Sequence, residues 1–279
     1  KGISNNPGSW STGADLNTAR GVAGGAGVSN ASALAFGGFP VTGATEAYNG
    51  TAWTELNDLN SGRRQLAGAG TQTAALGFGG DPNVALTELW NGTNWTEVND
   101  LNQGRQKLSG AGATNTAALA FGGQPGPDSA TELWNGTNWT AVNSLNSGRY
   151  YIAGAGTQTS AIAAGGEDKQ VNTESWNGTN WTEVNNLNNG RHAAGSAGSD
   201  NTSALVFGGL GAGPSNVAFT ESWNGSNWTE LADMSVARQM ITGAGVQTSA
   251  LGFGGYATPY VATTEEWNAG LETVTFDVS

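Results

Sequence analysis

This chain of 279 residues contains no cysteine and a single histidine, His192. The first absence excludes disulfides and thiol chemistry, and the second excludes a metal site built from several histidines. No stretch approaches the roughly 20 consecutive apolar residues of a transmembrane helix. No apolar core of a signal peptide is visible either. We therefore expect no membrane span, no bound metal and no cofactor.

Positive charge is also scarce, because 10 basic residues face 22 acidic ones and the formal net charge is −12. Such a chain repels phosphate backbones, so nucleic acid is excluded as a partner. The composition is rich in glycine, with 45 residues against 7 prolines, and it includes 11 tryptophans. Many Gly and Trp residues with few charges are typical of short strands joined by tight turns, not of disorder.

A unit of 42 to 47 residues occurs six times, and each copy contains an Arg, a Gly-Gly pair and a Glu in that order. The Arg residues are Arg20, Arg63, Arg105, Arg149, Arg191 and Arg238. The pairs begin at Gly37, Gly79, Gly122, Gly165, Gly208 and Gly254. The Glu residues are Glu46, Glu88, Glu132, Glu174, Glu221 and Glu265. A repeat of this length is typical of propellers and solenoids.

The second copy predicts four short strands, and no helical periodicity accompanies them. The expected strands are Leu66–Thr71, Ala74–Phe78, Thr87–Trp90 and Asn94–Val98. The first is built from Gly and Ala, which suits an innermost strand near a central axis. Asn91-Gly92 predicts a type I′ hairpin turn between the last two strands. Four strands per unit predict an all-β, six-bladed β-propeller that occupies residues 1–279 as a single domain.

The outermost strand has only five internal copies, each marked by a Trp ten residues before the next Arg. Trp10 has the same spacing to Arg20. We therefore expect the N-terminal strand around Trp10 to complete the sixth blade and close the ring, which removes both open sheet edges. Residues 271–279 include an alternating stretch, Leu271–Val278, that reads as an extension strand. This segment could compete for the same edge or lead out toward a neighbouring chain.

The order of Arg, small strand, apolar strand ending in Gly-Gly, aromatic strand and Trp strand resembles the kelch repeat over almost the whole chain. The chain has Trp-Asn-Gly where kelch repeats usually have Tyr-Asp-Pro. The phrases GAGTQTAALGFGG and TELWNGTNWTEVNDLN more narrowly resemble kelch-like structural proteins of tailed marine bacteriophages. This resemblance implies a virion protein, such as a tail fibre, an appendage or a decoration protein. Galactose oxidase chemistry is excluded, because kelch-like oxidases need a Cys-linked Tyr and two His ligands for copper.

The repeated Arg and Glu residues allow two interpretations. They could present a ring of Arg to an anion, or they could form a buried pair that holds each blade in register. We favour the second, because one anion site does not need six identical pairs. The repeated Asn-Gly-Thr and Asn-Trp-Thr sequences match N-glycosylation sites, and we interpret them as turn and strand residues of the blade. The loop residues Asp15, Asp58, Asp100 and Asp233 are expected to cap loops and not to bind calcium.

The loops between the second and third strands differ from copy to copy, whereas the other turns are uniform. Binding sites are usually carried by variable loops on a rigid scaffold, although loops also vary where nothing constrains them. Tyrosine offers an apolar face and a hydroxyl to a sugar or a protein. The candidate binding residues are Tyr150, Tyr151, Glu167, Asp168, Lys169, Gln170, His192, Tyr256 and Tyr260. No catalytic residue is identified.

These observations predict a non-enzymatic virion structural or host-recognition module. Its partners would be other virion proteins or a surface receptor, glycan or protein, and it could form a homo-oligomer within a larger assembly. The alternative is a secreted or cell-surface bacterial propeller that binds carbohydrate or protein. A glycan hydrolase is the weakest of the three hypotheses, because no pair of carboxylates is singled out.

Overall fold

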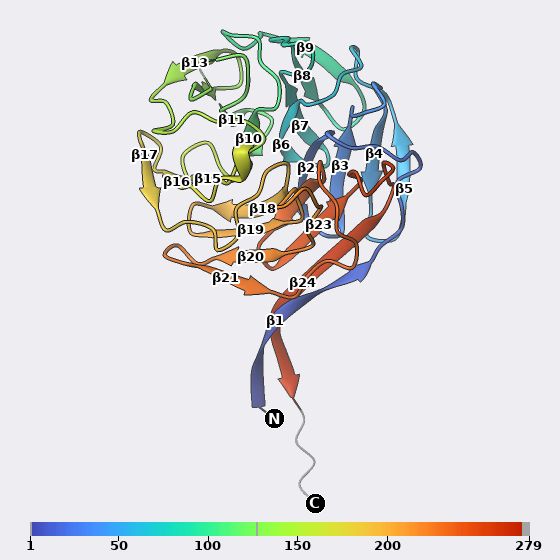
Figure 1. The fold of residues 1–279 in the computed structure, drawn as a ribbon. Coiled ribbons are helices and arrows are strands. Elements are labelled where there is room, and N and C mark those ends of the chain that lie inside the picture. Colours follow the sequence, from blue (N-terminus) through green and yellow to red (C-terminus); the bar gives the residue numbers. More distant parts are fainter. Residues whose placement is uncertain (1, 127, 275–279) are drawn as a thin grey trace, which may run out of the picture.

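The computed structural model describes residues 2–126 and 128–274 and contains six sheets of four antiparallel strands each. The sheets are arranged around a central axis as the blades of a six-bladed β-propeller (Figure 1). The fold predicted from the repeats is therefore confirmed. Among the described residues, no helix is long and apolar enough to cross a membrane.

Each blade contributes one strand to each of four concentric positions. The innermost strands are β2 (Gly24–Ser29), β6 (Ala67–Thr71), β10 (Ser109–Thr114), β14 (Ala153–Gly156), β18 (Gly195–Asp200) and β22 (Thr242–Val246). The second strands are β3 (Ser32–Phe36), β7 (Ala74–Phe78), β11 (Ala117–Phe121), β15 (Ala161–Ala164), β19 (Ser203–Phe207) and β23 (Ser249–Phe253). Gly and Ala at the innermost position leave no bulky side chain near the axis, so six strands can approach one another there.

The third strands are β4 (Thr45–Tyr48), β8 (Thr87–Trp90), β12 (Thr131–Trp134), β16 (Thr173–Trp176), β20 (Thr220–Trp223) and β24 (Thr264–Val274). The outermost strands are β5 (Trp53–Leu56), β9 (Trp95–Val98), β13 (Trp139–Val142), β17 (Trp181–Val184), β21 (Trp228–Leu231) and β1 (Gly2–Thr12). A short 3-10 helix, η1 (Glu167–Lys169), lies in the fourth blade.

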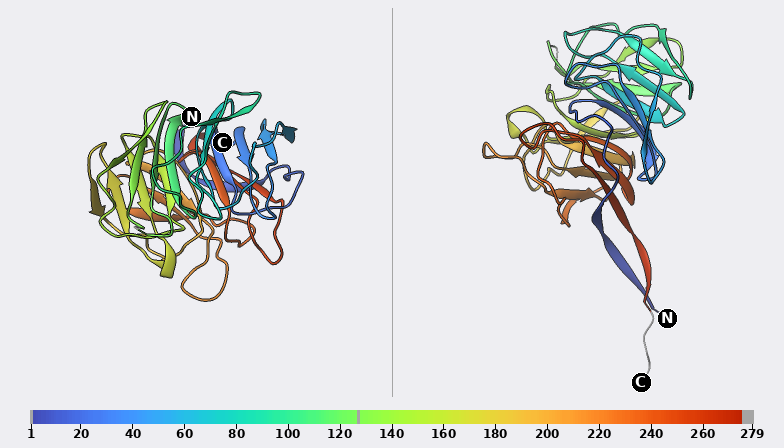
Figure 2. Two further views of the ribbon diagram at one scale, coloured as in Figure 1. Left: turned by 90° about the horizontal axis from the view of Figure 1, so that it is seen from above. Right: turned by 90° about the vertical axis from the view of Figure 1, so that its right-hand side faces the viewer.

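The ring is closed by the N-terminal strand, as the spacing of Trp10 predicts. Strand β1 pairs antiparallel with β24 as the outermost strand of the sixth blade, and Trp10 lies opposite Trp267. The C-terminal segment does not compete for this edge. Residues 271–274 continue β24 and pair with residues 2–5 of β1. The two strands project from the ring as a ribbon (Figures 1 and 2). The rest of the expected extension, residues 275–279, lies outside the described residues.

The prediction of a type I′ turn at Asn91-Gly92 is wrong. Four residues separate Trp90 from its strand partner Trp95, and Gly92 has a φ of 91° whereas Asn91 has no positive φ. The Asn91 side chain instead accepts hydrogen bonds from the backbone N–H groups of Thr93 and Asn94, both at 2.9 Å. The side chain therefore replaces a backbone partner within the turn, as asparagine commonly does.

Six apolar clusters fill the wedges between neighbouring blades. In each wedge the Trp of an outermost strand also donates its indole N–H to a Thr hydroxyl of the preceding blade. These pairs are Trp53–Thr264, Trp95–Thr45, Trp139–Thr87, Trp181–Thr131, Trp228–Thr173 and Trp10–Thr220, at 2.9 to 3.2 Å. The six bonds form a complete circle, and the one from Trp10 joins the last blade to the fifth. The N-terminal strand thus closes the packing as well as the sheet.

The repeated Arg and Glu residues form six buried ion pairs, one in each blade. The pairs are Arg20–Glu46, Arg63–Glu88, Arg105–Glu132, Arg149–Glu174, Arg191–Glu221 and Arg238–Glu265, at 2.5 to 3.0 Å. All twelve residues are at most 3% exposed. Burial lowers the pKa of Arg20, Arg105, Arg191 and Arg238, and the partner Glu opposes this effect. These side chains are enclosed within blades and are not offered to a ligand.

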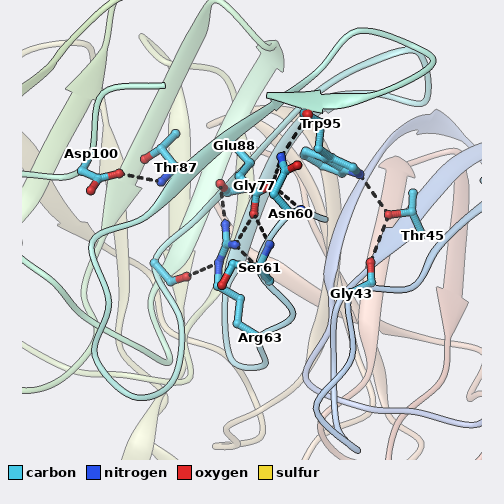
Figure 3. A network of polar contacts seen from close by, with 11 residues as sticks. Gly43, Thr45, Asn60, Ser61, Arg63, Gly77, Thr87, Glu88, Trp95 and Asp100 are labelled. Atoms are coloured by element: carbon cyan, nitrogen blue, oxygen red, sulfur yellow. Dashed lines mark hydrogen bonds and ion pairs between the residues drawn. The ribbon is translucent and has the colours of Figure 1, made fainter. Parts of the chain in front are cut away.

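The pair in the second blade shows that an Arg of this set can bind backbone carbonyls as well as its Glu (Figure 3). Arg63 donates to the backbone carbonyls of Gly79 at 2.9 Å, Ser61 at 3.0 Å and Gly77 at 3.2 Å, in addition to Glu88. The Gly-Gly pair follows from this packing, because a Cβ on Gly79 would lie 2.7 Å from the carbonyl oxygen of Arg105. Gly79 also has a φ of 67°, which disfavours other residues.

Glu88 joins the blade to the preceding connection as well. Its carboxylate accepts from the backbone N–H of Asn60 at 2.7 Å and from the Asn60 side chain at 2.8 Å. The Asn60 side chain also donates to the carbonyl of Trp95 at 3.0 Å. Asp100 Oδ1 accepts from the backbone N–H of Thr87 at 3.0 Å, so this carboxylate caps a loop.

Candidate binding face

The variable loops and the residues that follow each repeated Arg lie on the same face of the propeller. Four isolated bridges join them: Gly21–Phe39, Gln106–Gln124, His192–Leu210 and Gln239–Tyr256. In the other two blades, Asp81 N donates to Arg64 O and Glu167 N donates to Tyr150 O, each at 2.9 Å. We call this side the loop face and define it by residues 39–44, 81–86, 124–130, 167–172, 210–219 and 256–263, excluding residue 127. The opposite side, with the uniform turns, is the turn face.

A ring of six residues surrounds the axis at the loop face. They are Val22, Gln65, Lys107, Tyr151, Ala193 and Met240, all with φ between 51° and 58°. The backbone N–H of each donates to the carbonyl of the ring residue in the preceding blade, at 2.7 to 3.1 Å. This left-handed backbone is uncommon for residues other than Gly, and it is held here by a closed circle of hydrogen bonds. We call these six residues the axial ring.

The axial ring is the main feature that the sequence interpretation missed, since only Tyr151 was among the candidates. The signal was the constant position of the ring residue, two places after each Arg. The residue types contain no such signal, because Val and Lys rarely adopt a positive φ. The conformation follows from contacts between blades, which one repeat does not reveal.

The structure brings together the candidates from the fourth and fifth blades. The rings of Tyr150 and Tyr151 lie 5.9 Å apart, and Tyr151 stacks on His192 at 5.9 Å between centroids. His192 Nε2 lies 4.0 Å from a carboxylate oxygen of Glu167. Burial lowers the pKa of His192, and the nearby Glu167 opposes this effect. The imidazole is therefore favoured in its neutral form.

Two further groups belong to this cluster but were not among the candidates. Lys107 Nζ lies 4.9 Å from the centroid of the Tyr151 ring and 5.0 Å from that of Tyr150. Gln65 Nε2 donates to the Tyr151 hydroxyl at 2.8 Å. Burial, followed by the charge of Glu167, raises the pKa of Tyr151 to about 12, so its phenol stays protonated at neutral pH.

The loop that follows β15 holds the other candidates. Asp168 and Lys169 have φ values of 60° and 59° within η1. Lys169 Nζ donates to the carbonyl of Ala212 in the fifth blade at 3.4 Å. Among the described residues, Gln170 Oε1 and His192 Nδ1 are buried without a hydrogen-bond partner. The loop thus contributes exposed charge and one unsatisfied polar group, Gln170 Oε1, to this face.

Tyr256 and Tyr260 form a second group in the sixth blade, with ring centroids 5.0 Å apart. Tyr260 also lies 5.1 Å from the ring of Phe39 in the first blade, and the guanidinium of Arg64 stands 4.9 Å over that Phe39 ring. Arg64 in turn pairs with Asp81 at 3.1 Å. The candidate residues therefore occupy two aromatic groups on one face and not a single cluster.

Charge is distributed unevenly between the loop face and the rim. Outside the six buried pairs the chain has four cations, and three of them, Arg64, Lys107 and Lys169, lie on the loop face; the fourth, Lys1, lies outside the described residues. The outermost strands instead expose Glu55, Glu97, Glu183 and Glu230. The cations near the axis attract an anionic group and the acidic rim repels it, so this attraction acts only at close range.

A cavity of about 140 Å³ opens at the axial ring and is lined below it by the innermost strands. A smaller cavity of about 70 Å³ follows toward the turn face and is lined by Gly and Ala with one Ser. In the part of the chain that the structure describes, no group of three or more His, Cys, Asp or Glu residues is arranged to hold a metal ion.

The architecture places this chain in the class of six-bladed β-propellers. Among solved structures, it is similar to one described as "Structure of YjhT", with a TM-score of 0.73 and 14% sequence identity, over 93% of this chain and 99% of that one. At this level of identity the likeness shows the fold alone. No protein-family model and no curated protein matches the chain.

Proposed function

We propose that this propeller is a non-enzymatic recognition module of a virion, in a tail fibre, an appendage or a decoration protein, and that its loop face binds a surface receptor. The observation that carries the recognition role is the contrast between the two faces. The loop face carries aromatic residues, the three described cations that lie outside the six buried pairs, and the loops that differ between blades. The turn face carries Asn-Gly-Thr-Asn turns in three blades and near-identical turns in two more, which suits a surface that is seated against other virion proteins.

The scaffold supports a binding role because the variable residues stand on a rigid frame. The buried ion pairs, the indole–hydroxyl circle and the axial ring all recur in every blade, so a loop can change without disturbing its neighbours. A non-enzymatic role is supported by the axial cavity, since its lining within residues 2–126 and 128–274 includes no Asp or Glu and acid–base chemistry on a glycan needs a pair of carboxylates. The assignment to a virion rests on the resemblance to phage kelch-like proteins.

A loop exchange tests the recognition role. The segment EDKQVN at residues 167–172 and the segment DPNVAL at residues 81–86 have equal length, so the first can be replaced by the second. We expect the replacement to abolish binding of the fluorescently labelled protein to host cells and to leave the midpoint of thermal unfolding nearly unchanged. Matched controls are Thr93→Lys and Thr179→Lys, which alter exposed positions on the turn face and should leave binding intact.

The opposite pattern, in which the exchanged protein binds and the turn-face variants do not, would show that the faces are assigned the wrong way round. A glycan array that reports binding without cleavage distinguishes recognition from hydrolysis. Antibody labelling of purified particles tests the virion assignment. Binding to cells combined with absence from particles would favour the alternative, a secreted or cell-surface bacterial propeller.

A further inference from the structure

We propose that the axial cavity is a subsite for the carboxylate of an acidic sugar, held by Lys107, Gln65 and Tyr151. This inference rests on the proposed recognition function and specifies the chemistry of its ligand, a surface polysaccharide that contains uronic acids. The first observation is the charge of the cavity. Among the described residues that line it, Lys107 alone is charged, although the whole chain has a net charge of −12.

Lys107 is also free to bind an anion. Within the described residues no carboxylate lies within 4.0 Å of its ammonium group, whereas Arg64 is paired with Asp81. The ammonium stands over two Tyr rings at about 5 Å, an arrangement that holds the side chain in place and leaves its hydrogen-bond donors available. A charged donor in a partly enclosed site binds a carboxylate more strongly than a neutral donor does.

The geometry of the axial ring places the other two donors beside Lys107. Gln65, Lys107 and Tyr151 are consecutive members of the ring, because Lys107 N donates to Gln65 O and Tyr151 N donates to Lys107 O, both at 2.9 Å. The Tyr151 hydroxyl accepts from Gln65 Nε2 at 2.8 Å, which leaves its own proton available to a ligand. Since the pKa of Tyr151 is raised to about 12, that proton is retained at neutral pH.

The apolar side chains on the other half of the axial ring favour a sugar as the ligand. Ala193, Met240 and Val22 complete the circle with apolar side chains, and the Tyr260 hydroxyl lies 3.6 Å from the sulfur of Met240. The mouth of the cavity is therefore polar and cationic on one arc and apolar on the other. A uronic acid has the same division, since its carboxylate projects from a ring whose C–H groups pack on apolar and aromatic surfaces.

Calorimetric titration of the whole chain with sodium glucuronate and galacturonate, compared with glucose and galactose, tests the subsite. We expect both uronates to bind at least about tenfold more tightly than the neutral sugars, and raised salt to weaken this binding. Lys107→Met should reduce uronate affinity about 10- to 100-fold, and Tyr151→Phe, which removes one hydrogen bond, by about 2- to 10-fold. Arg64→Met is the matched control, because Arg64 is a cation on the same face that is paired with Asp81 and does not line the cavity, and it should change affinity by less than about twofold.

Equal binding of glucose and glucuronate, or full uronate affinity in Lys107→Met, would overturn the proposal. If N-acetylated amino acids bind as tightly as uronates, the site recognises carboxylates of proteins and the assignment to a sugar is wrong. Cell binding separates this inference from the recognition function. If the loop exchange abolishes cell binding and Lys107→Met leaves cell binding unchanged, the recognition function is retained and the subsite is rejected. If the parent protein binds uronates but cell binding survives both the loop exchange and Lys107→Met, the subsite is retained and the loop face is rejected as the receptor surface.

Discussion

The buried Arg63–Glu88 pair should behave differently from an ion pair that only balances two charges. Replacing both members of a buried pair by apolar residues is often neutral or stabilising by about 1–4 kcal/mol, because the desolvation penalty disappears. Arg63, however, also donates to three backbone carbonyls, those of Ser61, Gly77 and Gly79. We therefore expect the double replacement Arg63→Met/Glu88→Leu to destabilise the protein.

The size of the effect follows from the groups that lose partners. Glu88→Leu alone leaves a buried guanidinium without its counter-charge, which costs about 3–5 kcal/mol. The double variant removes both charges but takes a donor from each of the three carbonyls, and a buried acceptor without its donor costs about 1–3 kcal/mol. Three such acceptors cost about 3–9 kcal/mol in total, which exceeds the gain of about 1–4 kcal/mol from removing the buried charges. The free energy of unfolding should thus still fall in the double variant, by about 2–5 kcal/mol.

Urea unfolding followed by tryptophan fluorescence measures these differences directly. The fourth blade provides an internal repeat, because Arg149 donates to the corresponding carbonyls of Ser147, Ala163 and Gly165, and its double variant with Glu174→Leu should lose a similar amount. Arg64→Met is the control, since its pair with Asp81 is partly exposed and such pairs contribute at most about 1 kcal/mol. A double variant at Arg63 and Glu88 that is as stable as the parent would refute the argument that Arg holds the carbonyls.

Three further outcomes are expected. Deleting residues 1–12 uncovers Trp267 and opens the ring, so urea unfolding should lose its single cooperative transition and the midpoint should fall. Thr45→Val removes the acceptor of the Trp95 indole and should cost about 1 kcal/mol in the same assay, whereas an unchanged midpoint would show that the circle of indole bonds adds nothing to packing. Burial and a hydrogen bond to a carboxylate raise the pKa of Tyr48 to about 12, above the ordinary value of about 10, so its contribution to stability should be full below about pH 10 and lost as the pH approaches about 12. The pH dependence of unfolding between these values should be less steep in Tyr48→Phe, and an identical profile would contradict the assignment.

Much of the fold was predictable because the same local sequence pattern occurs in each of the six repeats. The strands expected at Ala74–Phe78 and Thr87–Trp90 have those bounds in the structure. The pairing of the N-terminal strand followed from one spacing, that of Trp10 to Arg20. The Asn-Gly turn was mispredicted because the dipeptide suits two different turns, and the asparagine side chain selected the longer one by bonding to Asn94.

The candidate site was predictable only in part. Variation between repeats identified the loop face, but it gave no indication that Gln65 and Lys107 lie beside Tyr151, because these residues belong to three different blades. Their proximity is created by closure of the ring, which converts equivalent positions in the sequence into neighbours around an axis. The two aromatic groups are separated for the same reason, since Tyr151 belongs to the fourth blade and Tyr260 to the sixth.

The sequence by itself thus determined the number of blades, the order of strands within each blade and the residue that closes the ring, since these depend on local periodicity and on repeated spacing. Only the tertiary structure decided the left-handed backbone of the axial ring, the three carbonyls that each of Arg63 and Arg149 satisfies and the position of Lys107 at the mouth of the cavity. These features come from contacts between segments far apart in the chain. Such contacts form only when six blades meet around a common axis, so the sequence of one repeat does not reveal them.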